Sequence, residues 1–543
     1  MSTTKKMLSV ILAAATALSV TACGGSETVN QGNSGNDSDG GSTTTTTSLS
    51  LSEAAAPEID ETAETGIVKY FTYETNFETA SAKMLTLFKE RYNGEITVEN
   101  TATSMNYFEM LGTKIATGLS PDLIRYEWAA FPHGMSYNMF TPLDTYINLD
   151  DPLWSGMKVT AEQYAYNGKH FYVPYMYSTY FALNYNNRVL EENGISDPMQ
   201  YVKDNTWDWS KFEEMLKRWQ DIDPVNHIAY NGVSALPFGF TTGKKFIEVT
   251  KDGQIINNLR DPDIVRCMQW LEGLRKNHLT GASPDQAAAG AHNGYTDPGE
   301  AFVDGNLMFL GMEPTWTYGA AKEALDGKSI PNEMKFIPFP RDPQADKWYQ
   351  CTDTFGYLIP AGAENVKGAV DWLVMLRTEE IDPENVATAK SKACDTSPEY
   401  YPICSNADCG DTVNPDSKGR HSFTVEENEA GVSVCPSCGT ARKEKYKVVW
   451  SEEQWDMYQE MLIDGDKYSL LYDNLYGFSA DFKDLFVDSN DNLLTGVLFN
   501  DLSYNQRVEE IYNAVEGYLQ PYRDRMAADA RGEEVTTTPP AEA

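Results

Sequence analysis

Apolar and polar residues alternate along the first part of the chain with the spacing of strands and helices. The runs at 67–73, 96–98 and 123–126 are apolar and aromatic, which is typical of short strands. Between them, apolar residues recur three and four positions apart over 84–92 and 108–115, which predicts two helices. A strand–helix–strand–helix–strand order predicts an α/β lobe with a mostly parallel sheet.

The stretch from 168 to 187 departs from this pattern because it is denser in aromatic residues than a core strand needs. It opens on a turn at Asn167 and Gly168. Pro174 follows and marks a strand end or edge, since proline cannot donate a ladder hydrogen bond. Helical spacing then returns, which predicts further helices over 206–219, 261–274, 366–374, 451–462 and 508–519.

Length and charge limit the class of protein. The chain has 543 residues, which is too long for one domain and suits two or three. It carries 80 acidic and 43 basic residues, a formal net charge of −37. So acidic a surface repels DNA, RNA and anionic lipid, and we expect no nucleic-acid partner.

Residues 1–22 have the pattern of a secretory signal peptide. Two lysines precede an apolar core at 7–20, which is short for a membrane span. The core ends in Val-Thr-Ala-Cys-Gly, which resembles the lipobox of bacterial lipoproteins and implies that Cys23 is lipidated. The alternative is an ordinary cleaved signal with a chance cysteine. Composition predicts a flexible tether at 23–65 and a disordered tail at 526–543.

Several short motifs behind the lipobox resemble, in their order, those of the family 1 extracellular solute-binding proteins of ABC importers. GKHFYVP at 168–174, followed by a run ending in Tyr-Asn, resembles the family's first crossing between two lobes. The other motifs are the Gly-x-x-Pro-Asp turn at 118–122, TWDW at 206–209, AFVDGNLM at 301–308 and GMEPTW at 311–316. The resemblance covers about residues 66–377 and 450–522.

This resemblance implies a two-lobed α/β fold of the periplasmic-binding-protein type II, with a ligand cleft between the lobes. Lobe 1 is then expected at 66–181 and 357–470, and lobe 2 at 182–356 and 471–525. The expected ligand is a carbohydrate of oligosaccharide size, which lobe closure delivers to an ABC permease without catalysis. We therefore expect a monomer outside the cytoplasm that meets the membrane through its lipid anchor only.

Sugar binding favours flat aromatic side chains beside carboxylates, because sugars present C–H faces and many hydroxyls. From their positions in the family pattern, the resemblance implies ligand contacts from Tyr73, Glu74, Glu127, Trp128, Tyr175, Tyr177, Tyr180, Trp316 and Tyr318. Two alternatives from other classes stay open. A secreted glycoside hydrolase shares such an aromatic cleft and needs a carboxylate pair, and a peptide- or polyamine-binding protein suits the acid excess.

A cysteine-rich insertion at 392–447 is a part that such a scaffold does not require. Cys404 and Cys409, then Cys435 and Cys438, resemble the two knuckles of a zinc ribbon, although the first pair has four intervening residues where two are usual. Because the segment is poor in large apolar residues, we expect structural zinc to hold it together, and no organic cofactor. Disulfides, or iron and redox chemistry, are the alternatives.

Overall fold

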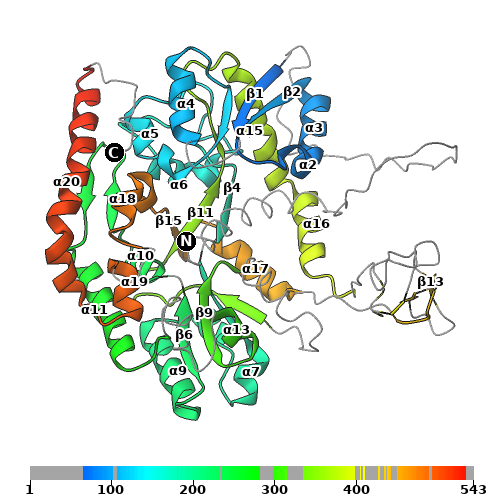
Figure 1. Cartoon of the computed structure of the whole chain (residues 1–543), viewed down its shortest axis with the longest axis vertical. Coiled ribbons are helices and arrows are strands. Elements are labelled where there is room, and N and C mark those ends of the chain that lie inside the picture. The colour runs from blue at the N-terminus through cyan, green and yellow to red at the C-terminus, as the bar shows by residue number, and fades with distance from the viewer. Residues whose placement is uncertain are drawn as a thin grey trace.

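The computed structural model describes residues 65–101, 107–179, 181–232, 234–281, 298–314, 334–397, 449–487 and 492–533, with parts of the insertion between 404 and 441. The signal peptide, Cys23 and the tether up to residue 64 lie outside the described residues, as do Tyr180, Trp316 and Tyr318. The described residues form two α/β lobes joined by a small central sheet (Figure 1).

Lobe 1 is built on a four-stranded sheet with the order β12-β3-β1-β2. Its strands are β1 (Gly66–Thr72), β2 (Gly94–Asn100), β3 (Leu123–Arg125) and β12 (Tyr357–Leu358). The first three are parallel, and β12 is antiparallel to β3. Helices cover both faces of this sheet (Figure 1): α2 (Phe77–Ala80), α3 (Ala82–Tyr92), α4 (Tyr107–Ala116) and α15 (Val366–Ile381).

Lobe 2 is built on a second four-stranded sheet with the order β10-β5-β9-β6. Its strands are β5 (Ala182–Asn186), β6 (Ile228–Gly232), β9 (Leu307–Met312) and β10 (Met334–Ile337). Asp208 caps the long helix α9 by accepting a hydrogen bond from the Lys211 amide. The helices of this lobe are α7 (Asn187–Glu192), α8 (Met199–Lys203), α9 (Trp209–Ile222), α10 (Leu236–Phe240), α11 (Pro262–Lys276), α13 (Pro298–Val303) and α19 (Leu493–Phe499).

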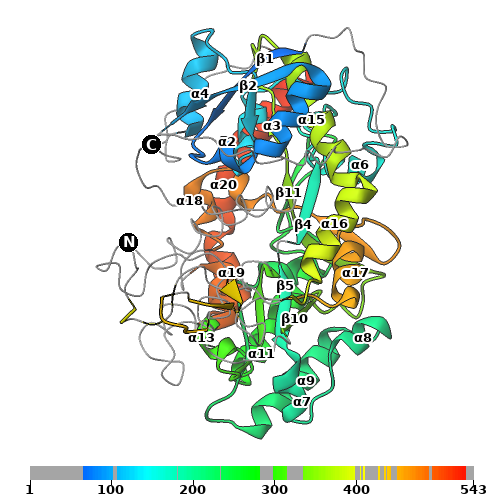
Figure 2. The ribbon, with the colours of Figure 1, turned by 90° about the vertical axis from the view of Figure 1, so that its right-hand side faces the viewer.

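Three strands between the lobes form the central sheet. Strand β11 (Trp348–Phe355) pairs antiparallel with β4 (Met176–Thr179) and parallel with β15 (Tyr468–Leu471). Each strand adjoins one of the stretches that the sequence predicts as a crossing between lobes. Figure 2 shows the two lobes at opposite ends of β4 and β11, so these strands set the separation between the lobes.

The long helix α20 (Tyr504–Ala530) runs along the side of both lobes (Figure 1). Met526 is almost fully buried, and its carbonyl accepts a hydrogen bond from Asn167. The helix therefore continues through residues 526–530, which the sequence analysis assigned to a disordered tail. Within the described part of the chain, no helix has the length and apolar character that crossing a membrane requires.

The hairpin of β7 (Ile247–Val249) and β8 (Ile255–Asn257) packs against α20 and reaches lobe 1, where the Gly168 amide donates to the Lys251 carbonyl. Short elements complete lobe 1: η1 (Trp128–Ala130), α5 (His133–Ser136), η2 (Ser155–Met157) and α6 (Lys158–Gln163). After β15, near which the chain passes between the lobes for the third time, come η4 (Leu475–Gly477) and α18 (Ala480–Lys483).

Helices α16 (Pro383–Ala393) and α17 (Glu452–Met461) flank the cysteine-rich insertion, which holds the short strands β13 (Glu426–Glu427) and β14 (Ser433–Val434). Helix α17, which the sequence predicts over 451–462, begins with a capping box formed by Ser451 and Gln454. The side chain of Gln454 also donates to the Met334 carbonyl in β10. This helix therefore packs on the edge of lobe 2, although it belongs to a segment expected in lobe 1.

Gly477 allows η4 to pack directly against η1. A Cβ atom on this residue would lie 1.7 Å from the carbonyl oxygen of Phe131, a distance that no packing arrangement tolerates. Because the obstacle is backbone, it cannot be relieved by a side-chain rotation. A glycine at this position therefore sets how closely the chain after the third crossing approaches lobe 1.

Gly477→Ala should lower the free energy of unfolding by about 1–3 kcal/mol, the usual cost of overpacking a tight contact. Gly273→Ala is the matched control, since a Cβ there meets nothing within 4 Å and helix α11 gains a better helix former. Urea unfolding of both variants measures the difference. Equal stability of the two variants would contradict the close contact.

Candidate functional site

The carboxyl ends of β1 and β3 bring a buried ion pair to the side of lobe 1 that faces the central sheet. Arg125 Nη1 lies 2.7 Å from Glu74 Oε1, and both side chains are mostly buried. Tyr70 donates to the second oxygen, Glu74 Oε2, at 3.0 Å. Glu74 and Arg125 are thereby held in fixed orientations.

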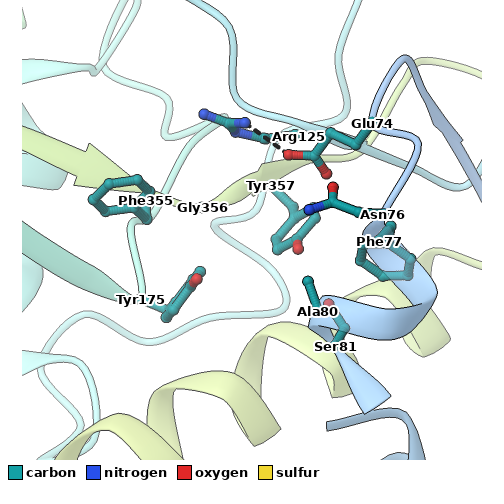
Figure 3. Close-up of a pocket in the computed structure, with 10 residues that line it drawn as sticks. All are labelled: Glu74, Asn76, Phe77, Ala80, Ser81, Arg125, Tyr175, Phe355, Gly356 and Tyr357. Carbon is teal, nitrogen blue, oxygen red and sulfur yellow. Dashed lines mark hydrogen bonds and ion pairs between the residues drawn. The ribbon is translucent and has the colours of Figure 1, made fainter. Parts of the chain in front are cut away.

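This ion pair lines a small pocket with a cavity volume of about 30 Å³ (Figure 3). Tyr175 and Tyr357 lie on the other side of it, with ring centroids 6.4 Å apart and an interplanar angle of 18°. Figure 3 shows Asn76 and Phe355 completing the pocket at its two ends. The pocket thus combines aromatic faces with charged and amide groups, as sugar-binding sites do.

A second hydrogen-bonded pair lies beside the first. The Tyr73 hydroxyl donates to Glu127 Oε1 at 2.8 Å. Burial raises the pKa of Glu127, although Arg125 and the Tyr73 hydroxyl act to lower it. Burial also lowers the pKa of Arg125, but Glu127 and Glu74 outweigh this effect, and the net shift is upward. The Arg125 guanidinium therefore interacts electrostatically with both the Glu74 and the Glu127 carboxylate.

Trp128 and Tyr476 form an aromatic pair next to these charges. Their ring centroids are 4.1 Å apart and tilted by 43°, and both side chains are partly buried. Lys483 lies 5.7 Å from the Tyr476 ring centroid, a cation–π distance. The pair joins the end of β3 to the segment after the third crossing.

Asp353 in the central strand β11 is a candidate that sequence reasoning missed. Its Oδ1 accepts a hydrogen bond from the Thr354 amide at 2.8 Å. Burial raises the pKa of Asp353 to about 6, against the lowering effects of that amide and of Arg125. Asp353 also acts to raise the pKa of Glu127, so the two carboxylates are close enough to influence each other.

The nine predicted ligand residues fall into three groups. Tyr73, Glu74, Glu127 and Trp128 follow the ends of β1 and β3, and Tyr175 lines the pocket. Tyr177 is buried in the core of lobe 1, and its hydroxyl donates to the Gly156 carbonyl. The remaining three, Tyr180, Trp316 and Tyr318, lie outside the described residues.

Arg125 was also missed, although its position carried a signal. An arginine that ends a short strand of buried residues must have an anionic partner, because an unpaired guanidinium there would be costly. Asp353 carried a similar signal, as an acid in the aromatic-rich strand Trp348–Phe355. A chain of this acidity has many isolated acids, however, so the strand pairing was needed to identify this one.

The four cysteines of the insertion form a second candidate site. Their sulfur atoms all lie within 4.8 Å of one another, with Cys404–Cys438 at 3.6 Å and Cys409–Cys435 at 3.8 Å. Four thiolates at about 2.3 Å from a tetrahedral zinc ion would be separated by about 3.8 Å. The cysteines can therefore hold a metal ion, and the donor set fits zinc.

The insertion is attached near the edge of lobe 2. The Trp450 amide donates to the Ala393 carbonyl at 2.9 Å, which brings together the two ends of the insertion. The Trp450 ring packs against Phe336 of β10 and Tyr458 of α17, with centroids 5.1 Å from each. The four cysteines are thus carried on a segment that is separate from the pocket of lobe 1.

Comparisons with known proteins agree with this architecture. A family model described as bacterial extracellular solute-binding protein matches residues 83–390. No curated protein matches the chain.

Solved structures with a similar fold include the sugar-binding protein MalE of Xanthomonas citri, at 12% identity and a TM-score of 0.56, covering 84% of this chain and 98% of that one. A sugar transporter from Rhizobium etli in an open conformation has 12% identity and a TM-score of 0.54, covering 83% and 98%. UspC of M. tuberculosis has 13% identity and a TM-score of 0.53, covering 83% and 100%. At these identities the likeness establishes the fold alone.

Asp353 makes the stability of the protein depend on pH in a defined direction. Its folded-state pKa of about 6 lies above the ordinary value of 3.8, so the folded protein holds this proton more tightly than the unfolded chain. The stability from that proton is fully present below about pH 4 and is lost as pH rises through 6. Asp353→Asn should therefore flatten the fall in stability between pH 4 and pH 7.

Urea unfolding at several pH values measures this effect, with Asp466→Asn as the control because that residue is exposed. The control should keep the slope of the parent protein. An unchanged slope in Asp353→Asn would mean that the carboxyl is not held protonated by burial.

Proposed function

The chain belongs to the bacterial extracellular solute-binding proteins, and we propose that it captures a carbohydrate in the cleft between its lobes and delivers it to an ABC permease. The observation that carries this proposal is the convergence of aromatic faces and hydrogen-bonding charges where β1 and β3 end. The Trp128–Tyr476 pair and Tyr175 offer flat surfaces, and Glu74, Arg125 and Glu127 offer fixed acceptors and donors.

The chemistry of sugars suits this arrangement. A pyranose ring presents apolar C–H groups that pack on an aromatic face, while its hydroxyls donate to carboxylates and accept from a guanidinium. The aromatic pair and the pocket at Tyr175 are contributed by different segments, which favours a ligand of several sugar units. One protein of similar fold is a sugar-binding protein from Xanthomonas citri, which is consistent with this class of ligand.

Transport requires binding and release and no covalent step. The two lobes close on the ligand around the central sheet, and the closed protein then docks on the permease. Lipidation of Cys23 would hold the protein at the outer side of the cell membrane, with residues 24–65 as the tether. We propose that it acts there as a monomer.

Trp128→Ala should weaken glycan binding by about 1–3 kcal/mol, equal to about 5- to 150-fold, the scale for losing the contact of a buried aromatic ring. A glycan array identifies the ligand, and calorimetry compares the variant with Tyr146→Ala, which removes an exposed ring. Unchanged affinity in Trp128→Ala would place the sugar elsewhere. If the protein hydrolyses a bound glycan and Glu74→Gln or Glu127→Gln abolishes this activity, the protein is an enzyme.

We also propose that the four cysteines hold a structural zinc ion that organises the insertion. Cys404, Cys409 and Cys435 are buried and Cys438 is exposed, and the four thiolates suit a closed tetrahedral site. A metal supplies what the segment lacks in apolar residues, because the binding free energy of structural zinc becomes folding free energy.

Protein purified without added metal should contain about one zinc per chain by elemental analysis, because four thiolates bind one ion. Cys435→Ser should lose that zinc and leave glycan affinity unchanged, with Cys351→Ser, a buried cysteine of the central sheet, as the control. Metal-free protein without free thiols in the insertion would indicate disulfides instead.

A further inference from the structure

The position of Tyr476, one half of the aromatic pair, depends on a side chain that is far from the pocket in sequence. Tyr522 in α20 donates its hydroxyl proton to the Phe478 carbonyl at 2.7 Å. Phe478 directly follows η4, which carries Tyr476. The Tyr522 ring also meets the Phe478 ring edge-on, with centroids 5.1 Å apart.

Tyr522 is itself fixed by lobe 1. His133 Nδ1 lies 2.9 Å from the Tyr522 hydroxyl oxygen. The single hydroxyl proton already goes to the Phe478 carbonyl, so the ring nitrogen must be the donor in this contact. Burial lowers the pKa of His133 to about 4, with a further lowering by Arg525 in α20, so the imidazole is neutral at physiological pH.

These contacts form a chain from lobe 1 toward the aromatic pair: His133 contacts Tyr522, and Tyr522 contacts Phe478, which lies two residues after Tyr476. On the other side of Tyr476, Gly477 allows η4 to pack directly against the Phe131 carbonyl. The backbone around Tyr476 is therefore held between η1 and α20. A change at Tyr522 is transmitted to Tyr476 through two residues.

Helix α20 contacts the two lobes with different halves. Its first half binds lobe 2, where the Tyr504 hydroxyl donates to the Leu259 carbonyl at 3.0 Å. Its second half contacts lobe 1, where Arg525 stacks on the Tyr137 ring at 3.7 Å and the Met526 carbonyl accepts from Asn167, and it also contacts the β7–β8 hairpin, where Arg523 Nε donates to the Ile255 carbonyl at 2.9 Å.

The two halves meet at Gly517 and Pro521, both inside the helix. Residues four apart normally share a backbone hydrogen bond, and proline has no N–H to donate, so the Gly517 carbonyl has no helical partner. The helix therefore lacks one backbone hydrogen bond at this point.

We infer that Tyr522 is a positioning residue for the ligand cleft, because it holds Tyr476 against Trp128. The expected effect of Tyr522 on ligand binding rests on the proposed function. The effect of Tyr522 on the position of Tyr476 is independent of that function, so the two effects can be tested separately.

Tyr522→Phe removes the hydroxyl and keeps the ring, and Tyr518→Phe is the matched control one turn earlier, since Tyr518 is exposed and meets Phe482 edge-on. In protein labelled with 5-fluorotryptophan, the ¹⁹F resonance of Trp128 is assigned by its absence in Trp128→Phe. Tyr522→Phe should shift that resonance and leave those of Trp219 and Trp372 in place. Tyr518→Phe should shift none of the three.

Glycan binding gives the second readout. Tyr522→Phe should weaken binding of the glycan found for the parent protein about fivefold, equal to about 1 kcal/mol, with Tyr518→Phe unchanged. A lower thermal midpoint with an unshifted Trp128 resonance would overturn the inference and leave Tyr522 a purely structural residue. Absence of glycan binding by the parent protein would overturn the proposed function, while the Trp128 resonance would still decide whether Tyr522 positions the pair.

Discussion

The pairing of β11 with both β4 and β15 is the constraint on which the rest of the structure depends. Each of these strands lies where the chain passes between the lobes, and backbone hydrogen bonds keep them at fixed separations. The ends of β1 and β3, the pocket at Tyr175 and the carboxyl of Asp353 are placed relative to one another by this sheet. A movement of the lobes must bend these strands together.

Electrostatics sets the character of the cleft that this sheet supports. Three carboxyl groups of the cleft, those of Glu74, Glu127 and Asp353, are partly shielded from water. Among the described residues, Arg125 supplies the guanidinium that interacts with them. Burial therefore raises the pKa values of Glu127 and Asp353, and ligand hydroxyls can satisfy carboxyl groups that water reaches poorly. The large negative charge of the whole chain is a separate property, from which we expect repulsion of nucleic acids.

Much of the fold was predictable from local patterns, because strand and helix spacing, Pro174 and the capping box at Ser451 act within a few residues. Glu74, Glu127 and Trp128 were expected from their positions in the family pattern, and the parallel strands β1 and β3 bring them to the same edge of the sheet. Arg125, Asp353 and Tyr522 depend on which distant segments meet. The same holds for the packing of α17 on β10 and the helical continuation of α20 past residue 525, which contacts with other segments determine.

The most direct test of the account is the distance between the lobes with and without a sugar. Spin labels attached through bioorthogonal amino acids at Lys89 in α3 and Lys217 in α9, both exposed, report this distance by pulsed electron paramagnetic resonance. The account predicts that a saturating oligosaccharide shortens and narrows the distance distribution and is recovered intact. A distribution that no oligosaccharide changes, or a sugar recovered as cleaved products, would contradict it.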